Sequence, residues 1–233
     1  MAIIDTVESG RLTLSGVTFD VDLSGALFSA IDCILIVADL HLEKGSSLAK
    51  RRGTLLPPYD TRATLTRLGE VITRLNAKTV IALGDTWHDD LGPERLDADD
   101  RAQLSSLMAR AEFIFVSGNH DPEPRHKGPV SIVNELALGE LILRHEPQSG
   151  ARFEIAGHLH PAAKIKGRGR ALRRRCFIAS ENRIILPAFG AYTGGLNVCD
   201  KAFAPLFPDQ DFIVHLLGDT RTYAAGPAQL IAD

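Results

Sequence analysis

The sequence predicts an α/β protein in which two β-sheets pack face to face and helices lie outside them. Three observations support this prediction. Short, continuous apolar runs recur along the chain, as in buried strands. Two stretches between these runs place apolar residues at helical spacing. After residue 162 the pattern is rich in strands and poor in helices, so a run of strands follows the strand–helix units.

The chain begins with a hairpin pattern. Residues 11–21 alternate apolar and polar residues around a Ser15-Gly16 turn, which is typical of two antiparallel strands. The apolar run at residues 33–38 predicts a strand buried on both faces, and residues 79–83 form another short apolar strand. Further strands are predicted at 112–117, 140–144, 153–156, 171–179, 183–188 and 211–217.

Two helices are predicted between these strands. The first covers residues 60–75, after a break at two prolines, and Asp60 could cap its start. The second covers residues 98–111 and is also amphipathic. The residues predicted to face inward are Leu65, Leu68, Ile72 and Leu75 in the first helix and Leu104, Leu107, Met108 and Ala111 in the second.

The composition excludes several classes of protein. The chain has 233 residues, of which 45% are hydrophobic and 24% charged, so it is not disordered, collagen-like or a disulfide scaffold. Without repeats or a clear linker, it is predicted to form one domain over residues 1–233. The net charge of −3 argues against coating nucleic acid through bulk charge, but it allows local basic patches.

The cysteines and the N-terminal residues predict a cytoplasmic protein. Cys33, Cys176 and Cys199 are odd in number and far apart, as expected of reduced thiols. The N-terminal residues lack the basic and apolar segments of an export signal. No apolar run approaches the roughly 20 residues of a membrane span, so no membrane partner is expected.

Five short polar clusters each directly follow an apolar run, and they hold six of the eight histidines. Each cluster alone is typical of a turn, a solvated loop or a core histidine. If the strands are parallel neighbours, all five clusters meet at one edge, where ligands gather in open α/β sheets. The clusters are Asp39-Leu40-His41, Gly84-Asp85-Thr86-Trp87-His88, Gly118-Asn119-His120-Asp121, His145 and Gly157-His158-Leu159-His160.

These clusters contain more ligand atoms than one metal ion needs, so they predict a centre with two divalent ions sharing a carboxylate. A set of imidazoles, carboxylates and an amide without thiolate suits Mn²⁺, Fe or Zn²⁺ better than Ca²⁺. Two such ions form a clamp for displacement at phosphorus. The candidate ligands are Asp39, His41, Asp85, Asn119, His145, His158 and His160, with His88 and His120 to spare.

The five clusters resemble the motif series of the calcineurin-like metallophosphoesterases, namely DxH, GDxx(D/H), GNH(D/E), a lone H and GHxH. The resemblance implies a four-layer αββα sandwich, with two mixed β-sheets flanked by helices, and a dinuclear centre. It implies that His120 is the general acid, that Asp121 orients His120 and that Asp85 bridges the ions. By the same resemblance, the first ion is held by Asp39, His41, Asp85 and His160, and the second by Asn119, His145 and His158.

The flanks of the motifs, at residues 38–45, 56–61 and 186–196, resemble a narrower bacterial family, the ligase-associated DNA damage response endonucleases known as PdeM. This resemblance implies a manganese-dependent phosphodiesterase that acts on DNA. It also implies a role in DNA repair, with a DNA ligase and a helicase as partners. His88, where many phosphoesterases have Asp, also occurs in DNA-processing relatives. We place it near the substrate or behind the ligands.

A basic stretch between residues 164 and 175 offers contacts for the phosphates that flank the cleaved one. The alternative is a solvated hairpin edge, because basic residues also protect edge strands. A second small cluster lies at residues 50–52, and the acidic stretch 85–100 argues against nucleic acid. Trp87, Phe189 and Tyr192 could stack on a base, but core packing is the expectation for each. The cations of the stretch are Lys164, Lys166, Arg168, Arg170, Arg173, Arg174 and Arg175.

Three functions remain open at this point. The first is a DNA phosphodiesterase or nuclease. The second is a phosphatase or phosphodiesterase for a nucleotide or a lipid-linked phosphate, which would need a narrow, capped pocket; no insertion large enough for a cap is evident. The third is a non-catalytic repair scaffold, which the complete ligand set disfavours. The oligomeric state also remains open, with a homodimer as one option.

Overall fold

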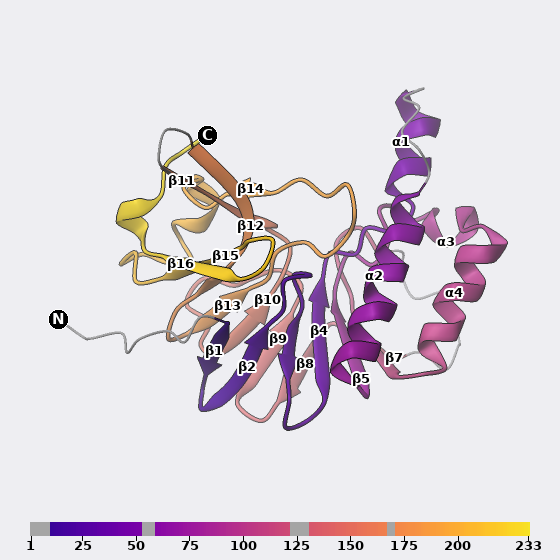
Figure 1. The fold of residues 1–233 in the computed structure, drawn as a ribbon, viewed down its shortest axis with the longest axis horizontal. Helices are drawn as coiled ribbons and strands as arrows, with labels where there is room; N and C mark the ends of the chain where they lie inside the picture. The colour runs from indigo at the N-terminus through magenta and orange to yellow at the C-terminus, as the bar shows by residue number, and fades with distance from the viewer. Residues whose placement is uncertain (1–9, 53–58, 122–130, 167–170) are drawn as a thin grey trace.

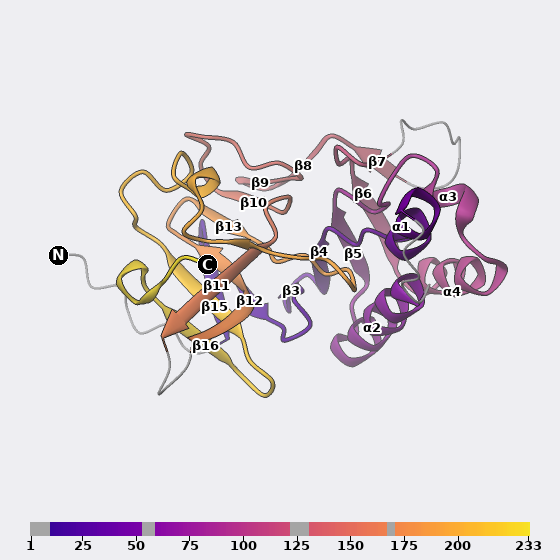
Figure 2. The same cartoon turned by 90° about the horizontal axis from the view of Figure 1, so that it is seen from above.

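The computed structural model describes residues 10–52, 59–121, 131–166 and 171–233. In this part of the chain, two mixed β-sheets face each other (Figure 1). Viewed from above, the α-helices lie beyond the first sheet, on the side away from the second (Figure 2). The predicted α/β fold with two mixed sheets is therefore confirmed.

The first sheet contains seven strands in the order β1-β2-β3-β4-β5-β6-β7. Its first four strands are antiparallel neighbours, whereas β4 to β7 run parallel. The predicted hairpin and the three predicted strands of this half are present, and β3 and β7 were not predicted. The strands are β1 (Arg11–Leu14), β2 (Val17–Val21), β3 (Leu27–Ser29), β4 (Ile34–Ala38), β5 (Thr79–Leu83), β6 (Glu112–Val116) and β7 (Ser131–Val133).

Four α-helices pack outside the first sheet: α1 (Lys44–Arg52), α2 (Asp60–Leu75), α3 (Gly92–Arg95) and α4 (Ala98–Met108). Both predicted helices are present, but α4 ends three residues earlier than predicted. The expected cap at Asp60 was wrong. Tyr59 precedes the helix, and the Asp60 carboxylate instead accepts the backbone N–H of Gly45 in α1. Helix α1 was not predicted because its mostly polar sequence lacks an apolar period.

The second sheet follows the order β14-β11-β12-β13-β10-β9-β8, with β15 and β16 attached beside β12. Strands β9, β10 and β13 run parallel, and β12 runs antiparallel to β13. All five predicted strands of this half are present, four of them shorter than predicted. The strands are β8 (Glu135–Leu138), β9 (Leu141–Arg144), β10 (Glu154–Ala156), β11 (Pro161–Lys166), β12 (Ala171–Ala179), β13 (Arg183–Ile185), β14 (Leu196–Asn197), β15 (Ile213–Leu217) and β16 (Thr222–Ala225).

The core between the sheets is built from apolar side chains of both, among them Phe19, Leu83, Leu143 and Phe177. A second cluster fills the space between the first sheet and its helices. The resemblance also implies helices on the outer face of the second sheet, and the structure differs there. Within the described residues this face carries no α-helix, and the short 3₁₀ helix Lys201–Phe203 and the loop after it supply its phenylalanines.

The two sheets place the carboxyl ends of β4, β5, β6, β9 and β10 at one edge of the molecule. The backbone N–H of Gly190 in the second half donates to the carbonyl of Asp39 at 3.0 Å. The five polar clusters follow these same strands, so the edge collects them as predicted. None of the described helices is long and apolar enough to cross a membrane.

Candidate metal centre

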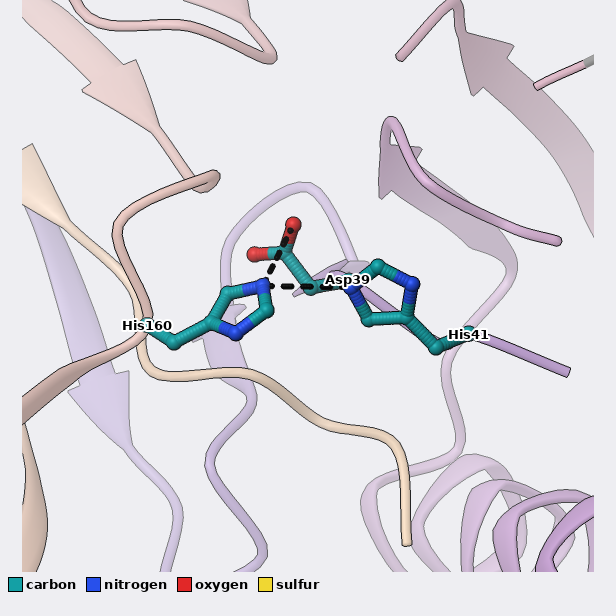
Figure 3. Close-up of side chains that lie close together, drawn as sticks. All are labelled: Asp39, His41 and His160. Atoms are coloured by element: carbon teal, nitrogen blue, oxygen red, sulfur yellow. Dashed lines mark hydrogen bonds and ion pairs between the residues drawn. The ribbon is translucent and has the colours of Figure 1, made fainter. Parts of the chain in front are cut away.

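The first group of candidate ligands contains Asp39, His41 and His160. Figure 3 shows the two imidazole rings pointing toward each other, with the Asp39 carboxylate beside them. The Nε2 atoms of the two histidines are 3.2 Å apart, and Nε2 of His160 lies 3.2 Å from Oδ1 of Asp39. Asp39 and His41 are buried, and His160 is partly buried. The three side chains therefore present ligand atoms to a single point.

The second group contains Asp85, His145 and His158. Nε2 of His145 lies 3.4 Å from Oδ1 of Asp85 and 3.1 Å from Nδ1 of His158. The amide oxygen of Asn119 lies 2.9 Å from the same Nε2. The structure thus brings a residue from each of four polar clusters to this second point.

Asp85 stands between the two groups. Its Oδ2 lies 3.7 Å from Nε2 of His41 in the first group, and its Oδ1 faces His145 in the second. The groups also meet behind Asp85, where Nδ1 of His145 lies 3.7 Å from Oδ1 of Asp39. A carboxylate with one oxygen toward each group of ligands could be shared by two ions.

Several candidate ligands have left-handed backbone conformations. Such a conformation costs about 1–3 kcal/mol per residue and occurs mainly where the surrounding structure enforces it. Hydrogen bonds between the loops enforce it here: the N–H of His41 donates to the carbonyl of Asp85, and the N–H of His158 donates to the Asp39 carboxylate. The residues with positive φ are Asp39, His41, Asp85, His158 and His160.

Two glycines leave the space that this arrangement needs. A Cβ atom at Gly84 would collide with the ring of His145, and φ at Gly84 is +70°. A Cβ atom at Gly118 would collide with the backbone nitrogen and the carboxylate of Asp85. The glycines in the second and third polar clusters are thus required by close packing around the candidate ligands.

The electrostatic setting suits metal ions. Burial, followed by the charge of His160, lowers the pKa of His41 to about 2, so the imidazole stays neutral, the form that binds metals. Burial also lowers the pKa of His158. Nδ1 of His145 lies 3.0 Å from the carbonyl of Leu83, which holds the tautomer with Nε2 free to bind. Nitrogen and oxygen donors without thiolate fit two divalent ions.

His120 lies at the exposed mouth of the centre. Its backbone N–H donates to Oδ1 of Asp85 at 2.9 Å. Its ring stacks on that of His88, with centroids 5.9 Å apart and planes 8° apart, and lies 5.6 Å from the ring of His41. A proton on His120 would therefore lie near the first group of ligands, within reach of a bound substrate.

Asp121 accepts the backbone N–H groups of Trp87 and Gly118 at 3.0 and 2.9 Å. Burial raises the pKa of its carboxyl group. These contacts tie the loop that carries His120 to the loop after β5. That Asp121 orients the His120 ring stays a prediction.

The predicted basic stretch forms the β11–β12 hairpin. Lys164 pairs across the strands with Arg173, and both lie near the carboxylate of Asp233, at 3.8 and 3.1 Å. Arg175 donates to the carbonyls of Ala188 and Ser24, at 2.7 and 3.3 Å.

Two of the remaining cations of this stretch are described: Lys166 is exposed at the end of β11, and Arg174 is partly buried. Arg168 and Arg170 lie outside the described residues. In the second basic cluster, Lys50 is exposed, and the side chains of residues 51 and 52 lie outside the described residues.

Of the three aromatic residues expected in the core, Phe189 is fully buried and Trp87 packs against the helical cluster. The expectation was wrong for Tyr192, which is 49% exposed because it lies in a turn beyond the end of β13. The sequence also gave no sign of Arg67. This arginine of α2 stacks on the Phe189 ring at 4.5 Å and donates to the Phe189 carbonyl.

Glu43 is a further residue that the motif series does not mark. Its carboxylate accepts the hydroxyl groups of Ser46 and Thr61, at 2.5 and 2.9 Å. Its position two residues after His41 was the only signal for it. The contact fastens the loop after β4 to the start of α2.

The fold resembles that of a solved nuclease. The crystal structure of the Pseudomonas putida nuclease MPE matches with a TM-score of 0.68 and 26% identity, over 93% of this chain and 100% of that chain. The Escherichia coli phosphoesterase Yfce matches only remotely, with a TM-score of 0.38 and 15% identity over 83% and 98% of the two chains. No family model and no curated protein matched the sequence. The two-sheet fold, the convergent ligand groups and the similarity to the Pseudomonas nuclease are consistent with a calcineurin-like metallophosphoesterase.

Proposed function

We propose that this protein is a nuclease that hydrolyses phosphodiester bonds in DNA with the help of two Mn²⁺ ions. The observation that carries the proposal is the position of Asp85, with one carboxylate oxygen toward each group of ligands. Two ions held there would supply positive charge for the phosphate oxygens and would lower the pKa of a water molecule. The similarity to the Pseudomonas nuclease and the two ligand groups support phosphodiester hydrolysis. DNA and manganese are the parts that we propose.

The residues divide into two ligand sets that share Asp85. Asp39, His41 and His160 would hold the first ion, as their converging atoms suggest. His145, His158 and Asn119 would hold the second. The backbone N–H groups of His120 and His158 donate to Asp85 and Asp39. These hydrogen bonds hold the two carboxylates in place before an ion arrives.

His120 would complete the reaction as general acid. When the bond to the leaving oxygen breaks, negative charge develops on that oxygen, and a ring nitrogen of His120 would donate a proton to it. Its exposure lets it reach a substrate, and the parallel ring of His88 limits how it can turn. Asp121 holds the surrounding loop in place through backbone hydrogen bonds.

Two observations favour DNA over a small phosphate ester. The solved structure with the higher similarity is that of a nuclease. In addition, strand β11 begins directly after His160, so the basic hairpin starts at the metal centre. A repair role in the cytoplasm, with a DNA ligase and a helicase as partners, follows from the family resemblance alone and remains part of the proposal.

The experiment that tests the proposal offers the Mn²⁺-loaded protein three substrates: bis(p-nitrophenyl) phosphate, a mononucleotide, and single-stranded or nicked DNA. We expect cleavage of the diester and of DNA, without release of phosphate from the monoester. Parallel reactions with Zn²⁺ and Fe²⁺ test the choice of metal. Turnover of the monoester alone would refute a nuclease and favour a small-molecule phosphatase.

A further inference from the structure

A pocket of about 440 Å³ is lined by three consecutive arginines of β12. Its volume is within the usual range for ligand sites and would admit a sugar-phosphate unit. The residues that line it come from the turn after β2, the start of β12 and the end of β15. They are Leu23, Arg173, Arg174, Arg175, Leu217, Gly218 and Asp219.

The pocket has an excess of positive charge. Asp219 is the only carboxylate among the residues that line it. Arg173 pairs with Asp233, but the hydrogen bonds of Arg175 go to neutral carbonyl groups, and that of Arg174 goes to the Arg173 carbonyl. Partly buried guanidinium groups without a carboxylate partner favour binding of an anion.

A neighbouring arginine adds to this charge. Arg67 is partly buried and contacts the same loop as Arg175: Arg67 donates to the Phe189 carbonyl and Arg175 to the neighbouring Ala188 carbonyl. Burial and then the charge of Arg175 lower the pKa of Arg67 to about 10. Two cations thus lie close enough to repel each other, and an anion in the pocket would reduce this repulsion.

The pocket lies at the same edge of the molecule as the metal centre. Strand β12 is antiparallel to β13, with Ile178 opposite Ile185, so residues 171–175 extend beyond the carboxyl end of β13. Arg175 is opposite Ala162, which follows His160 by two residues. The loop bonded to Arg175 continues to Gly190, whose N–H donates to the Asp39 carbonyl. The loop that Arg175 contacts therefore also contacts the first ligand group.

We propose that the pocket of Arg173, Arg174 and Arg175 binds a backbone phosphate of a single DNA strand, next to the phosphate cleaved at the metal centre. This inference rests on the proposed function, because it presumes a polymeric substrate. Arg174 forms the principal contact, since Arg175 is engaged with two carbonyls and Arg173 with Asp233. A guanidinium group is suited to this task because its donors fit two phosphate oxygens at once.

The test measures binding apart from catalysis. Fluorescence anisotropy of a labelled single-stranded oligodeoxynucleotide is recorded in EDTA for the wild type and for Arg174→Ala, Arg174→Lys and Arg152→Ala. The last is a matched control, because Arg152 is exposed and precedes the amino end of β10, at the opposite edge. We expect about tenfold weaker binding for R174A and a salt slope smaller by about 0.7. R174K keeps the slope, and R152A binds as the wild type does.

A second readout separates this inference from the proposed function. In the metal-loaded enzyme, R174A should lower kcat/KM for the oligonucleotide about tenfold more than for bis(p-nitrophenyl) phosphate. Equal losses for both substrates, or unchanged binding in EDTA, would overturn the phosphate pocket while leaving the nuclease intact. Conversely, a wild type that binds DNA through Arg174 but cleaves no diester would keep the pocket and refute the nuclease.

Discussion

Oδ2 of Asp85 lies 3.7 Å from Nε2 of His41, a residue that follows a different strand of the first sheet. The other oxygen of the same carboxylate faces His145 in the second sheet. One aspartate therefore connects loops from both halves of the sandwich. Because its two oxygens lie near separate ligand groups, removal of this carboxylate should weaken the binding of both ions.

Asp85→Asn should remove metal and activity together. The amide keeps the shape but loses the charge that two cations require, so hydrolysis should fall by more than the roughly 10–100-fold cost of losing an outer hydrogen-bond partner. Metal content and diester hydrolysis are measured on the same preparation. Asp90→Asn is the control, because Asp90 is an exposed carboxylate five residues away. An active D85N enzyme would contradict the shared role of Asp85.

His120→Ala should keep the metal ions and lose rate. A general acid contributes about 10²–10⁴-fold, and its contribution is greatest when the leaving oxygen is basic. DNA cleavage should therefore fall far more than hydrolysis of bis(p-nitrophenyl) phosphate, whose leaving group departs without a proton. Comparing kcat for the two substrates checks this. Equal losses for both would instead indicate a positioning role for His120.

The buried His215 should lower the free energy of unfolding of the metal-free protein in mild acid. It is 1% exposed, and burial lowers its pKa from 6.5 to about 4. Below pH 6.5 the unfolded chain takes up a proton that the folded protein accepts only near pH 4. The free energy of unfolding should therefore fall across this window, by about 3 kcal/mol, and stay nearly constant with respect to this group at higher pH.

Urea unfolding of the wild type and of His215→Phe measures this effect, with metal removed from both. The difference in unfolding free energy between the two proteins should change between about pH 7.5 and pH 4.5, in favour of the variant at low pH. A difference that is the same at both pH values would mean that His215 titrates alike in the folded and unfolded chain.

Asp233→Asn should tighten DNA binding at low salt. The Asp233 carboxylate pairs with Arg173 and Lys164 on the basic hairpin, so a DNA phosphate must compete with it. The pairs are exposed, and we expect a modest gain of about two- to fivefold in affinity that disappears at high salt. Asp209→Asn removes an exposed charge elsewhere and serves as control. An equal gain in both variants would reflect net charge alone.

Much of the site could be predicted because its chemistry is local in the chain. Each polar cluster directly follows a short apolar run, and an apolar run of that length encodes a buried strand. The fold could be predicted less fully. Several short or polar segments were missed, because they owe their structure to tertiary contacts rather than to their own periodicity. They are the helices α1 and α3 and the strands β3, β7, β8, β11, β14 and β16. Likewise, the Asp60 carboxylate accepts a hydrogen bond from the backbone N–H of Gly45 and does not cap its own helix.

The sequence by itself determined which ligand types this protein offers, their order along the chain and the strands that carry them. Only the tertiary structure decided how they combine. His41 and His160 are 119 positions apart and meet at 3.2 Å, and Asp85 faces both ligand groups. Likewise, Arg175 of β12 donates hydrogen bonds to the carbonyl of Ala188 after β13 and to the carbonyl of Ser24 in the loop between β2 and β3. The reason is physical: the apolar faces of two sheets pack together, and this packing sets distances between residues that no local pattern relates.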